Sequence, residues 1–265
     1  MVGLNDYVHL VTNLAQGFSV MIIETKVHTC RKCQSEDLVK NGTNASGSPL
    51  YHCKICGAYG VLEPRDGYTQ EEKEIIIKTY QERASMRGIE RIYGVCRQTL
   101  SAWLEEKADA LPPLEETLQP VDSENIPVLE VDELWSFVFR SKDKVWVWIA
   151  MNRETREIVA YACGDRSEDT CRILWDRVPS AYKEAIVFSD YWNAYQAVIP
   201  SEQHRPVGKE TGETAHIERW NNTLRQHLAR FVRKTLSFSK CIKMHEICLK
   251  LFIHRYNTEL LPIVG

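Results

Sequence analysis

The sequence predicts a multidomain protein of the α/β (α+β) class, in which two small N-terminal modules precede a larger domain with a mixed sheet. Three observations lead to this prediction. Two cysteine pairs stand in a polar N-terminal segment, helical hydrophobic patterns follow, and strand-like runs of Val, Ile, Trp and Phe come next. The first strands form a group and the later ones alternate with helices, which is typical of a mixed sheet flanked by helices.

The composition of the 265-residue chain is that of an ordinary globular protein, with 44% hydrophobic and 26% charged residues. Disorder and a membrane-spanning chain are both disfavoured, so we expect no membrane partner. The nine cysteines are odd in number and no signal-peptide pattern precedes them, which favours a reducing, cytoplasmic location. We expect residues 1–26 to form an N-terminal extension outside the modules.

The charges of the chain are unevenly distributed, although its net charge of −3 does not indicate a nucleic-acid partner. Residues 105–133 carry ten acids against one base. Residues 216–250 carry eight bases against two acids, which is typical of a segment that binds phosphates. A solvated helix face is the alternative interpretation of this basic segment.

Four cysteines within residues 27–65 predict a zinc ribbon. They form two Cys-x-x-Cys pairs separated by 19 residues, and this spacing suits tetrahedral Zn²⁺ held by four thiolates. Gly57 follows the second pair, where a turn toward the sulfurs needs a residue without Cβ. Four ordinary buried cysteines are the alternative. We expect one structural Zn²⁺ with the ligands Cys30, Cys33, Cys53 and Cys56.

Residues 66–107 predict a helix-turn-helix module. A capping-box sequence at Thr69 begins one helix, and shorter helical patterns follow over 85–92 and 96–107, with Gly94 at the turn. The second helix of such a motif enters the major groove of DNA, where Arg and Gln contact base edges. A helical hairpin without DNA contacts is the alternative. The expected DNA contacts at the start of the second helix are Arg97, Gln98, Thr99 and Ser101.

The rest of the chain predicts an acidic, proline-containing linker over 108–126 and a domain of strands and helices over 127–258. This domain begins with a three-stranded meander. The expected strands are 128–139, 144–151, 156–163 and 185–188, and the expected helices are 168–177, 191–198, 213–232 and 240–256.

Three carboxylates of this domain stand where they can share a site. Asp132 lies on the first strand, on the opposite face from Glu133 because side chains alternate. Asp190 directly follows a buried strand, at the kind of edge that lines a ligand crevice. Glu218 lies on a polar face of the helix over 213–232. Each carboxylate alone fits a cap or a surface charge equally well, but three of them beside a basic segment favour a site for divalent Mg²⁺.

Several blocks of the sequence resemble the catalytic part of insertion-sequence-one (IS1) family DDE transposases. These blocks are Val131–Trp135 (VDELW), Gly164–Ser167 (GDRS), Ser189–Tyr195 (SDYWNAY) and His216–Asn222 (HIERWNN). The segment 224–240 resembles that family especially closely, and the whole resemblance extends over residues 27–257. It implies a zinc ribbon and a helix-turn-helix followed by an RNase H-like mixed-sheet catalytic domain.

The resemblance implies a DDE-type DNA transposase. Such an enzyme binds the terminal inverted repeats of an insertion sequence and catalyses metal-dependent DNA cleavage and strand transfer. The family's triad, carried over, falls on Asp132, Asp190 and Glu218, which would hold Mg²⁺ or Mn²⁺. The expected partner is double-stranded DNA, both element ends and target, bound by a homodimer or higher assembly at the nucleoid. The expected DNA contacts in this domain are Asn222, Arg225, Arg230, Arg233 and Lys234.

Two other functions fit parts of the sequence. A transcription factor would use only the zinc and helix-turn-helix modules, but it leaves the three carboxylates unexplained. An RNase H-like nuclease would hydrolyse DNA without joining strands, and its metal chemistry is the same. Only the family blocks favour transposition over that nuclease.

Overall fold

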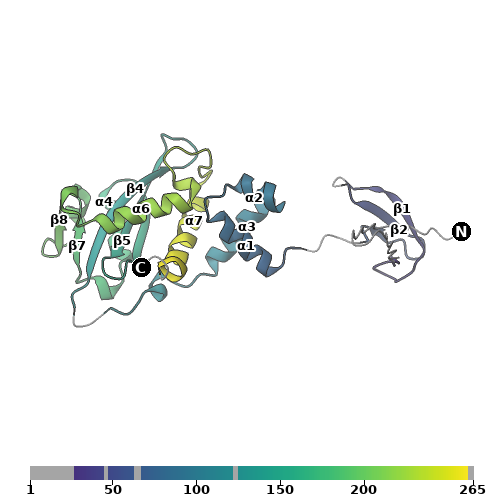
Figure 1. Cartoon of the computed structure of the whole chain (residues 1–265), viewed down its shortest axis with the longest axis horizontal. Coiled ribbons are helices and arrows are strands. Elements are labelled where there is room, and N and C mark those ends of the chain that lie inside the picture. The colour runs from purple at the N-terminus through teal and green to yellow at the C-terminus, as the bar shows by residue number, and fades with distance from the viewer. Residues whose placement is uncertain (1–26, 45–46, 63–66, 122–124, 262–265) are drawn as a thin grey trace, which may run out of the picture. The chain divides into compact units, whose positions relative to one another are not determined.

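The computed structural model describes residues 27–44, 47–62, 67–121 and 125–261. The chain forms two compact units that divide between Tyr68 and Thr69, and Figure 1 follows both along the chain. The extension predicted over 1–26 lies outside the described residues. The expected mixed α/β class is confirmed, with a cysteine-containing sheet first, helices next and a mixed sheet last.

The first unit is a three-stranded antiparallel sheet in the order β1-β2-β3, with strands Leu38–Thr43, Pro49–Cys53 and Tyr59–Gly60. Gly57 turns the chain with a φ of 70°, the left-handed conformation that favours a residue without Cβ. Among the described residues of this unit, the only buried apolar side chains are Cys30 and Cys53. A hydrophobic core therefore contributes little to the stability of this unit.

The second unit opens with three helices, α1 (Gln70–Tyr80), α2 (Met86–Tyr93) and α3 (Arg97–Asp109). The predicted capping box is present, because Glu72 N–H donates to Thr69 Oγ1 at 3.2 Å and Thr69 N–H donates to Glu72 Oε2 at 2.8 Å. Gly94 ends α2 with a φ of 71° and turns the chain into α3. Ile89 and Leu100 are fully buried where these helices meet.

The second unit continues into a five-stranded mixed sheet in the order β6-β5-β4-β7-β8. Its strands are β4 (Val128–Phe137), β5 (Lys144–Asn152), β6 (Ile158–Gly164), β7 (Ile186–Ser189) and β8 (His204–Pro206). β4, β5 and β6 form the predicted antiparallel meander, whereas β7 pairs in parallel with β4, and β8 with β7. β8 escaped prediction because three residues are too few to show a hydrophobic alternation.

Helices cover both faces of this sheet (Figure 1). They are α4 (Glu168–Arg177), α5 (Asn193–Val198), α6 (Ala215–His227) and α7 (Ile242–Arg255). Alternate residues of strand β4 point to opposite faces of the sheet. Leu129 and Val131 belong to the core with side chains of α4 and α5, whereas Asp132 accepts a hydrogen bond from Asn221 of α6.

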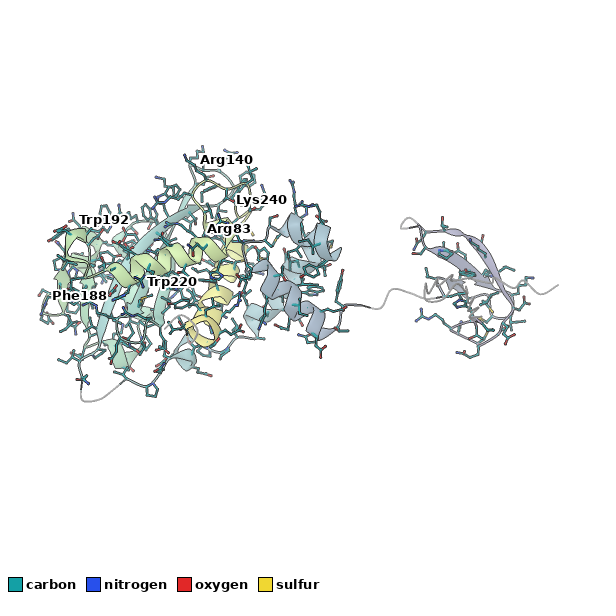
Figure 2. All side chains as sticks on the ribbon, viewed as in Figure 1. Arg83, Arg140, Phe188, Trp192, Trp220 and Lys240 are labelled. Atoms are coloured by element: carbon teal, nitrogen blue, oxygen red, sulfur yellow. The ribbon has the colours of Figure 1, made fainter. Side chains whose placement is uncertain are left out.

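Helix α7 packs on both α6 and α3. The ring centroid of Trp220 in α6 lies 6.1 Å from that of Phe252 in α7, and Figure 2 shows Trp220 on α6. Contacts between α3 and α7 join the helical module to the mixed sheet. Among the described helices, none is long and apolar enough to cross a bilayer. Short helical turns complete the fold at Leu114–Thr117, Ser180–Tyr182, Lys209–Thr211, Ala229–Phe231 and Tyr256–Leu260.

The helix predicted over 213–232 is shorter than predicted. α6 ends at His227, because Leu228 takes an extended conformation with φ −114° and ψ 103°. The His227 carbonyl accepts a hydrogen bond from Arg83 N–H at 2.6 Å instead of one from a further helical turn. The spacing of apolar residues along the sequence does not reveal where this helix ends, since Leu228 and Phe231 stay buried after its last turn.

Candidate active site and DNA-binding surfaces

The three predicted carboxylates lie on or directly after neighbouring elements. Asp132 lies in β4, Asp190 directly follows β7, and Glu218 lies in the first turn of α6. β4 and β7 run in parallel with Glu130 beside Phe188, so the same register places Asp132 beside Asp190 two residues later. α6 crosses the face of β4 that carries Asp132.

Asp132 lies in an environment that disfavours a negative charge. Burial, followed by the charges of Glu133, Asp190 and Glu218, raises the pKa of Asp132 to about 7. Asn221 donates to Asp132 Oδ2 at 2.7 Å, but an amide supplies no positive charge. A divalent cation would relieve this repulsion, and carboxylate oxygens are the donors that Mg²⁺ and Mn²⁺ prefer. The residues present therefore fit a divalent ion.

The end of β7 holds Asp190 in place through local hydrogen bonds. Asp190 Oδ1 accepts from Trp192 N–H at 3.0 Å, and Ser189 Oγ donates to the Asp190 carbonyl at 2.8 Å. Ser189 Oγ also shares a hydrogen bond of 2.7 Å with Nε2 of the buried His204 in β8. The unpredicted strand β8 thus supports the segment that carries Asp190.

Glu133 faces the opposite side of the sheet from Asp132, as strand alternation predicts, and it is buried there. Its Oε1 accepts from Arg166 Nε at 2.8 Å and from Arg166 Nη2, and its Oε2 accepts from Tyr195 Oη at 2.6 Å. The Arg166 guanidinium lies 3.9 Å from the ring centroid of Trp192. These residues come from three of the family-like blocks, which therefore meet in one buried network. The sequence pattern gave no sign of these partners.

Glu130, which sequence reasoning missed, caps the start of α6. It is fully buried, and its Oε2 accepts from the backbone N–H groups of His216 and Ile217, both at 3.1 Å. Its Oε1 accepts from Arg153 Nε at 3.0 Å. The first N–H groups of a helix need outside acceptors, and the residue before α6 gives no side-chain cap. A carboxylate two residues before Asp132 therefore anchors the helix that carries Glu218. The sequence feature that could have indicated this role of Glu130 is an acidic residue within the apolar run of a strand.

The basic residues around α6 differ in their exposure. Asn222, Arg233 and Lys234 are exposed, as DNA contacts must be. Arg225 is half-buried, and its Nε and Nη2 have no hydrogen-bond partner within the described structure. Burial and then the charge of Arg233 lower the pKa of Arg225, whereas Asp132 raises it. The charges of both Asp132 and Arg233 therefore act on Arg225.

Arg230 is not available to DNA, and the predicted contact is wrong for this residue. Its relative exposure is 5%, and its Nε donates to Tyr80 Oη of α1 at 2.9 Å. Its Nη1 donates to Ser239 Oγ and to the Met244 carbonyl, both at 3.1 Å. Arg230 joins the helical module to the mixed-sheet domain. A charge count along the segment cannot distinguish such a buried base from an exposed one.

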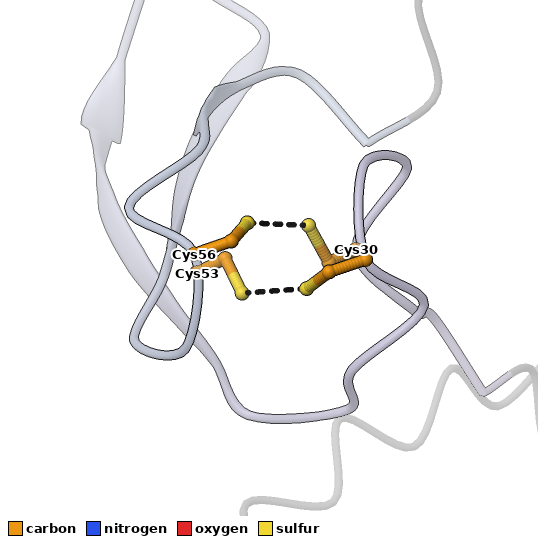
Figure 3. A group of neighbouring side chains, drawn as sticks. Cys30, Cys53 and Cys56 are labelled. Carbon is orange, nitrogen blue, oxygen red and sulfur yellow. Dashed lines mark hydrogen bonds between the residues drawn. The ribbon is translucent and has the colours of Figure 1, made fainter.

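The four predicted zinc ligands converge in the first unit (Figure 3). Cys30 Sγ lies 3.6 Å from Cys56 Sγ and Cys33 Sγ lies 3.5 Å from Cys53 Sγ, and all four sulfurs lie within 4.8 Å of one another. A tetrahedron with Zn–S distances of about 2.3 Å has edges of about 3.8 Å, so this spacing fits Zn²⁺. Among the described residues, no other group of at least three such ligands is gathered as tightly. The backbone N–H groups of Cys33 and Lys32 lower the pKa of Cys30 to about 6, which favours its thiolate.

The predicted DNA-contacting residues of α3 fall into two groups. Arg97 and Gln98 are exposed in its first turn, and Thr99 is half-buried. Arg97 Nε lies 3.3 Å from Glu90 Oε2, which places it beside α2. Ser101 is half-buried, and its hydroxyl donates to a methionine sulfur of α2 at 4.0 Å. The Ser101 hydroxyl therefore points toward α2.

Comparison with known proteins matches both parts of the second unit. Residues 126–258 match the family of IS1 transposases, and residues 63–112 match the CENP-B N-terminal DNA-binding domain. The insertion element iso-IS1n protein InsB of Shigella dysenteriae is 35% identical over 131 residues, which cover 49% of this chain and 95% of that protein. The insertion element IS1 protein InsB of Shigella flexneri is 36% identical over 117 residues, or 44% and 86% of the two chains.

A third relative is the insertion element IS1 4 protein InsB of Escherichia coli (strain K12), which is 35% identical over 129 residues, or 49% of this chain and 74% of that protein. The family match spans every strand and helix from β4 to α7, and therefore all three carboxylates. The chain belongs to the IS1 transposase family and carries a DNA-binding helical module ahead of the family's domain.

Proposed function

We propose that this protein is a DDE-type DNA transposase that cleaves the ends of an insertion sequence and joins them to target DNA. One observation carries the proposal most strongly. In a chain of the IS1 transposase family, the charges of Asp190, which follows β7, and Glu218 of α6 both act on Asp132 in β4 and help to raise its pKa. Arg225 lies beside this site, where a DNA phosphate would approach.

The chain's own residues orient the site. Asp132 and Asp190 would hold a divalent ion between adjacent strands, and Glu218 would complete the ligands from α6. A divalent ion bound there supplies a Lewis acid that makes a water or 3′-hydroxyl oxygen more nucleophilic and stabilises the leaving oxygen. Asn221 fixes one oxygen of Asp132, and Glu130 fixes the start of α6.

The DNA contacts are assigned to residues that are exposed or half-buried and not held inside the fold. We assign base reading in the major groove to Arg97, Gln98 and Thr99 at the start of α3. Phosphate contacts are assigned to Asn222, Arg225, Arg233 and Lys234. Zn²⁺ held by the four cysteines is structural, since it would complete a unit that has almost no apolar core.

The functional modules are assigned as 27–65 for the zinc ribbon, 66–107 for the helix-turn-helix and 127–258 for the catalytic domain. The residues 108–126 connect the last two. A homodimer or higher assembly on DNA accounts for the need to hold two element ends at one target.

The test is a reaction of the purified full-length protein with labelled element ends, a supercoiled target plasmid and Mg²⁺. We expect cleaved ends and products in which an end is joined to the plasmid. Cleavage without joining would favour the nuclease hypothesis over transposition. Sequence-specific binding without any Mg²⁺-dependent cleavage would favour the transcription-factor hypothesis.

A further inference from the structure

Two segments that follow the catalytic elements meet in one lobe. Residues 138–144 run from the end of β4 to the first residue of β5, and residues 232–241 lead from the end of α6 toward α7. Val138 and Ser239 form an isolated parallel bridge, and Phe139 N–H donates to the Ser239 carbonyl at 2.8 Å. We call these two segments together the basic lobe. Strand β4 and helix α6 thus both lead from the carboxylates into this lobe.

The basic lobe is strongly cationic. It contains one acidic residue, Asp143, and six basic residues, all of which are exposed. The basic residues are Arg140, Lys142, Lys144, Arg233, Lys234 and Lys240. Figure 2 shows Arg140 and Lys240, one from each segment, at the same end of the mixed-sheet domain. Such a surface attracts a polyanion, whereas the same lobe of a second copy would be repelled by like charge.

The basic lobe also presents an apolar side chain to solvent. Leu236 is 98% exposed, and it lies between the bases at 233–234 and 240. Ser237 N–H donates to Thr235 Oγ1 at 2.9 Å, which fixes the turn at whose tip Leu236 stands. Phe139, in the other segment, is 57% exposed and has a φ of 67°, a conformation that is costly for a residue with a Cβ. Leu236 therefore gains almost no stability from burial in the folded chain.

The distance from the carboxylates suits a contact on the same DNA duplex. β4 runs from Asp132 to Phe137, five residues that span about 17 Å at about 3.3 Å per residue, and it leads directly into the lobe at Val138. Base pairs of B-form DNA are about 3.4 Å apart, so this length corresponds to roughly five base pairs. DNA whose cleaved phosphate lies at Asp132 would therefore pass the basic lobe within one helical turn.

We propose that the basic lobe grips duplex DNA beside the cleaved phosphate and that Leu236 inserts between base pairs as a wedge. Proteins that unstack and bend DNA use apolar side chains flanked by basic residues in this way. The six basic residues supply the phosphate contacts, and the bend would expose the DNA strand to attack. The location of the wedge relative to the cleaved bond rests on the proposed function, whereas the unstacking itself does not.

The test uses Leu236→Ser in the full-length protein. Since the side chain is 98% exposed, its removal has no burial to lose and folding should be unaffected. Element-end duplexes carry 2-aminopurine at one position at a time, and the fluorescence of this base rises when it unstacks. Binding is measured with EDTA present, so that no cleavage is needed. Ile173→Ser, at an exposed position of α4, is the matched control, and Leu236→Met keeps an apolar side chain.

With the wild-type protein we expect a several-fold rise confined to one or two positions, within one helical turn of the cleaved end. Leu236→Ser should lose most of this rise, whereas Leu236→Met and Ile173→Ser should keep it. The wedge is overturned if the wild-type complex gives no localised rise, or if the rise persists in Leu236→Ser. If Leu236→Ser changes only the oligomer size in sedimentation, the wedge is also overturned, and Leu236 is assigned to a contact between copies of the chain instead. Failure of the proposed function would appear separately, as a normal rise without Mg²⁺-dependent cleavage.

Discussion

At the scale of single residues, neighbouring side chains of the same type have opposite environments. Arg230 is buried against α1, whereas Arg233, three residues later, is exposed. Asp132 accepts a hydrogen bond from the neutral amide of Asn221 in α6, whereas the adjacent Glu133 is bound by Arg166 on the other face. The element on which a residue lies, and the face that it occupies, decide which of these residues can meet DNA or metal.

Arg97 is the residue for which base recognition is most directly testable. Arg97→Ala should weaken binding to the cognate site by about 1–3 kcal/mol, because an exposed arginine at the start of α3 can contact a guanine through two hydrogen bonds. The measurement compares dissociation constants for the cognate site and for sites with single base changes. Arg87→Ala, at an exposed position of α2, is the control. Equal weakening on every sequence would instead make Arg97 a phosphate contact.

At the scale of elements, strand β4 organises the site through its alternation. Glu130 and Asp132 face α6, where one caps the helix and the other accepts from Asn221. Leu129 and Val131 face α4 and α5 and belong to the core there. A shift of one residue in the register of β4 would exchange these faces, so the core residues also fix the direction of the Asp132 carboxylate.

Some of these elements could be predicted from the sequence because their signals are local. The Thr69 capping box, the turn at Gly94 and the cysteine pairs are each defined by residues that lie close together in the chain. The end of α6 depends on Arg83, far upstream, and the cap of α6 comes from Glu130, 86 residues before His216. No local pattern contains such partners.

Glu130→Ala should destabilise the second unit by about 3 kcal/mol. It removes the acceptor of two helix N–H groups and leaves Arg153 without its buried partner. Urea unfolding measures this loss, and Glu154→Ala, at an exposed position, should change stability by less than about 0.5 kcal/mol. Mn²⁺ binding, followed by electron paramagnetic resonance, should weaken in Glu130→Ala because Glu218 loses its anchor. Unchanged stability would show that Glu130 does not hold α6.

The first unit should depend on its metal. We expect one Zn²⁺ per chain by elemental analysis, since four thiolates close on one ion and only Cys30 and Cys53 are buried apolar residues among those described there. Chelation should make the segment 27–62 sensitive to protease while the second unit stays resistant. Cys53→Ser should behave in the same way, whereas Cys241→Ser, at an exposed position outside the unit, should keep its zinc. A metal-free protein with a protease-resistant first unit would contradict this account.

At the scale of the whole molecule, the helical module and the mixed sheet form one compact unit. α3 packs on α7, Arg230 donates to Tyr80, and Arg255 Nη2 lies 2.7 Å from Glu82 Oε1. The start of α3, to which we assign base reading, is thus held at a fixed place relative to Asp132. A fixed geometry of this kind predicts cleavage at a constant distance from the recognised sequence.

Arg230 and Arg233 should therefore have opposite effects when changed. Arg230→Met should lower the free energy of unfolding by about 3 kcal/mol and leave the salt dependence of DNA binding unchanged, because it breaks buried hydrogen bonds between α1 and the mixed-sheet domain. Arg233→Gln should change stability by less than about 0.5 kcal/mol but reduce the salt slope by about one. Urea unfolding and titrations at several salt concentrations measure both. A reduced salt slope in a fully stable Arg230→Met would contradict the structural role.

The central claim is that Asp132, Asp190 and Glu218 together form a catalytic site for divalent metal. Its most direct measurement is Mg²⁺-dependent cleavage of element ends by Asp132→Asn, Asp190→Asn and Glu218→Gln, with DNA binding measured in parallel. Each change keeps the shape of the side chain and removes the charge that holds a cation. The account predicts cleavage at background level in all three variants, with binding nearly intact, and wild-type cleavage in the control Asp169→Asn on α4. Full cleavage by a folded Asp190→Asn protein, or an equal loss in Asp169→Asn, would contradict it.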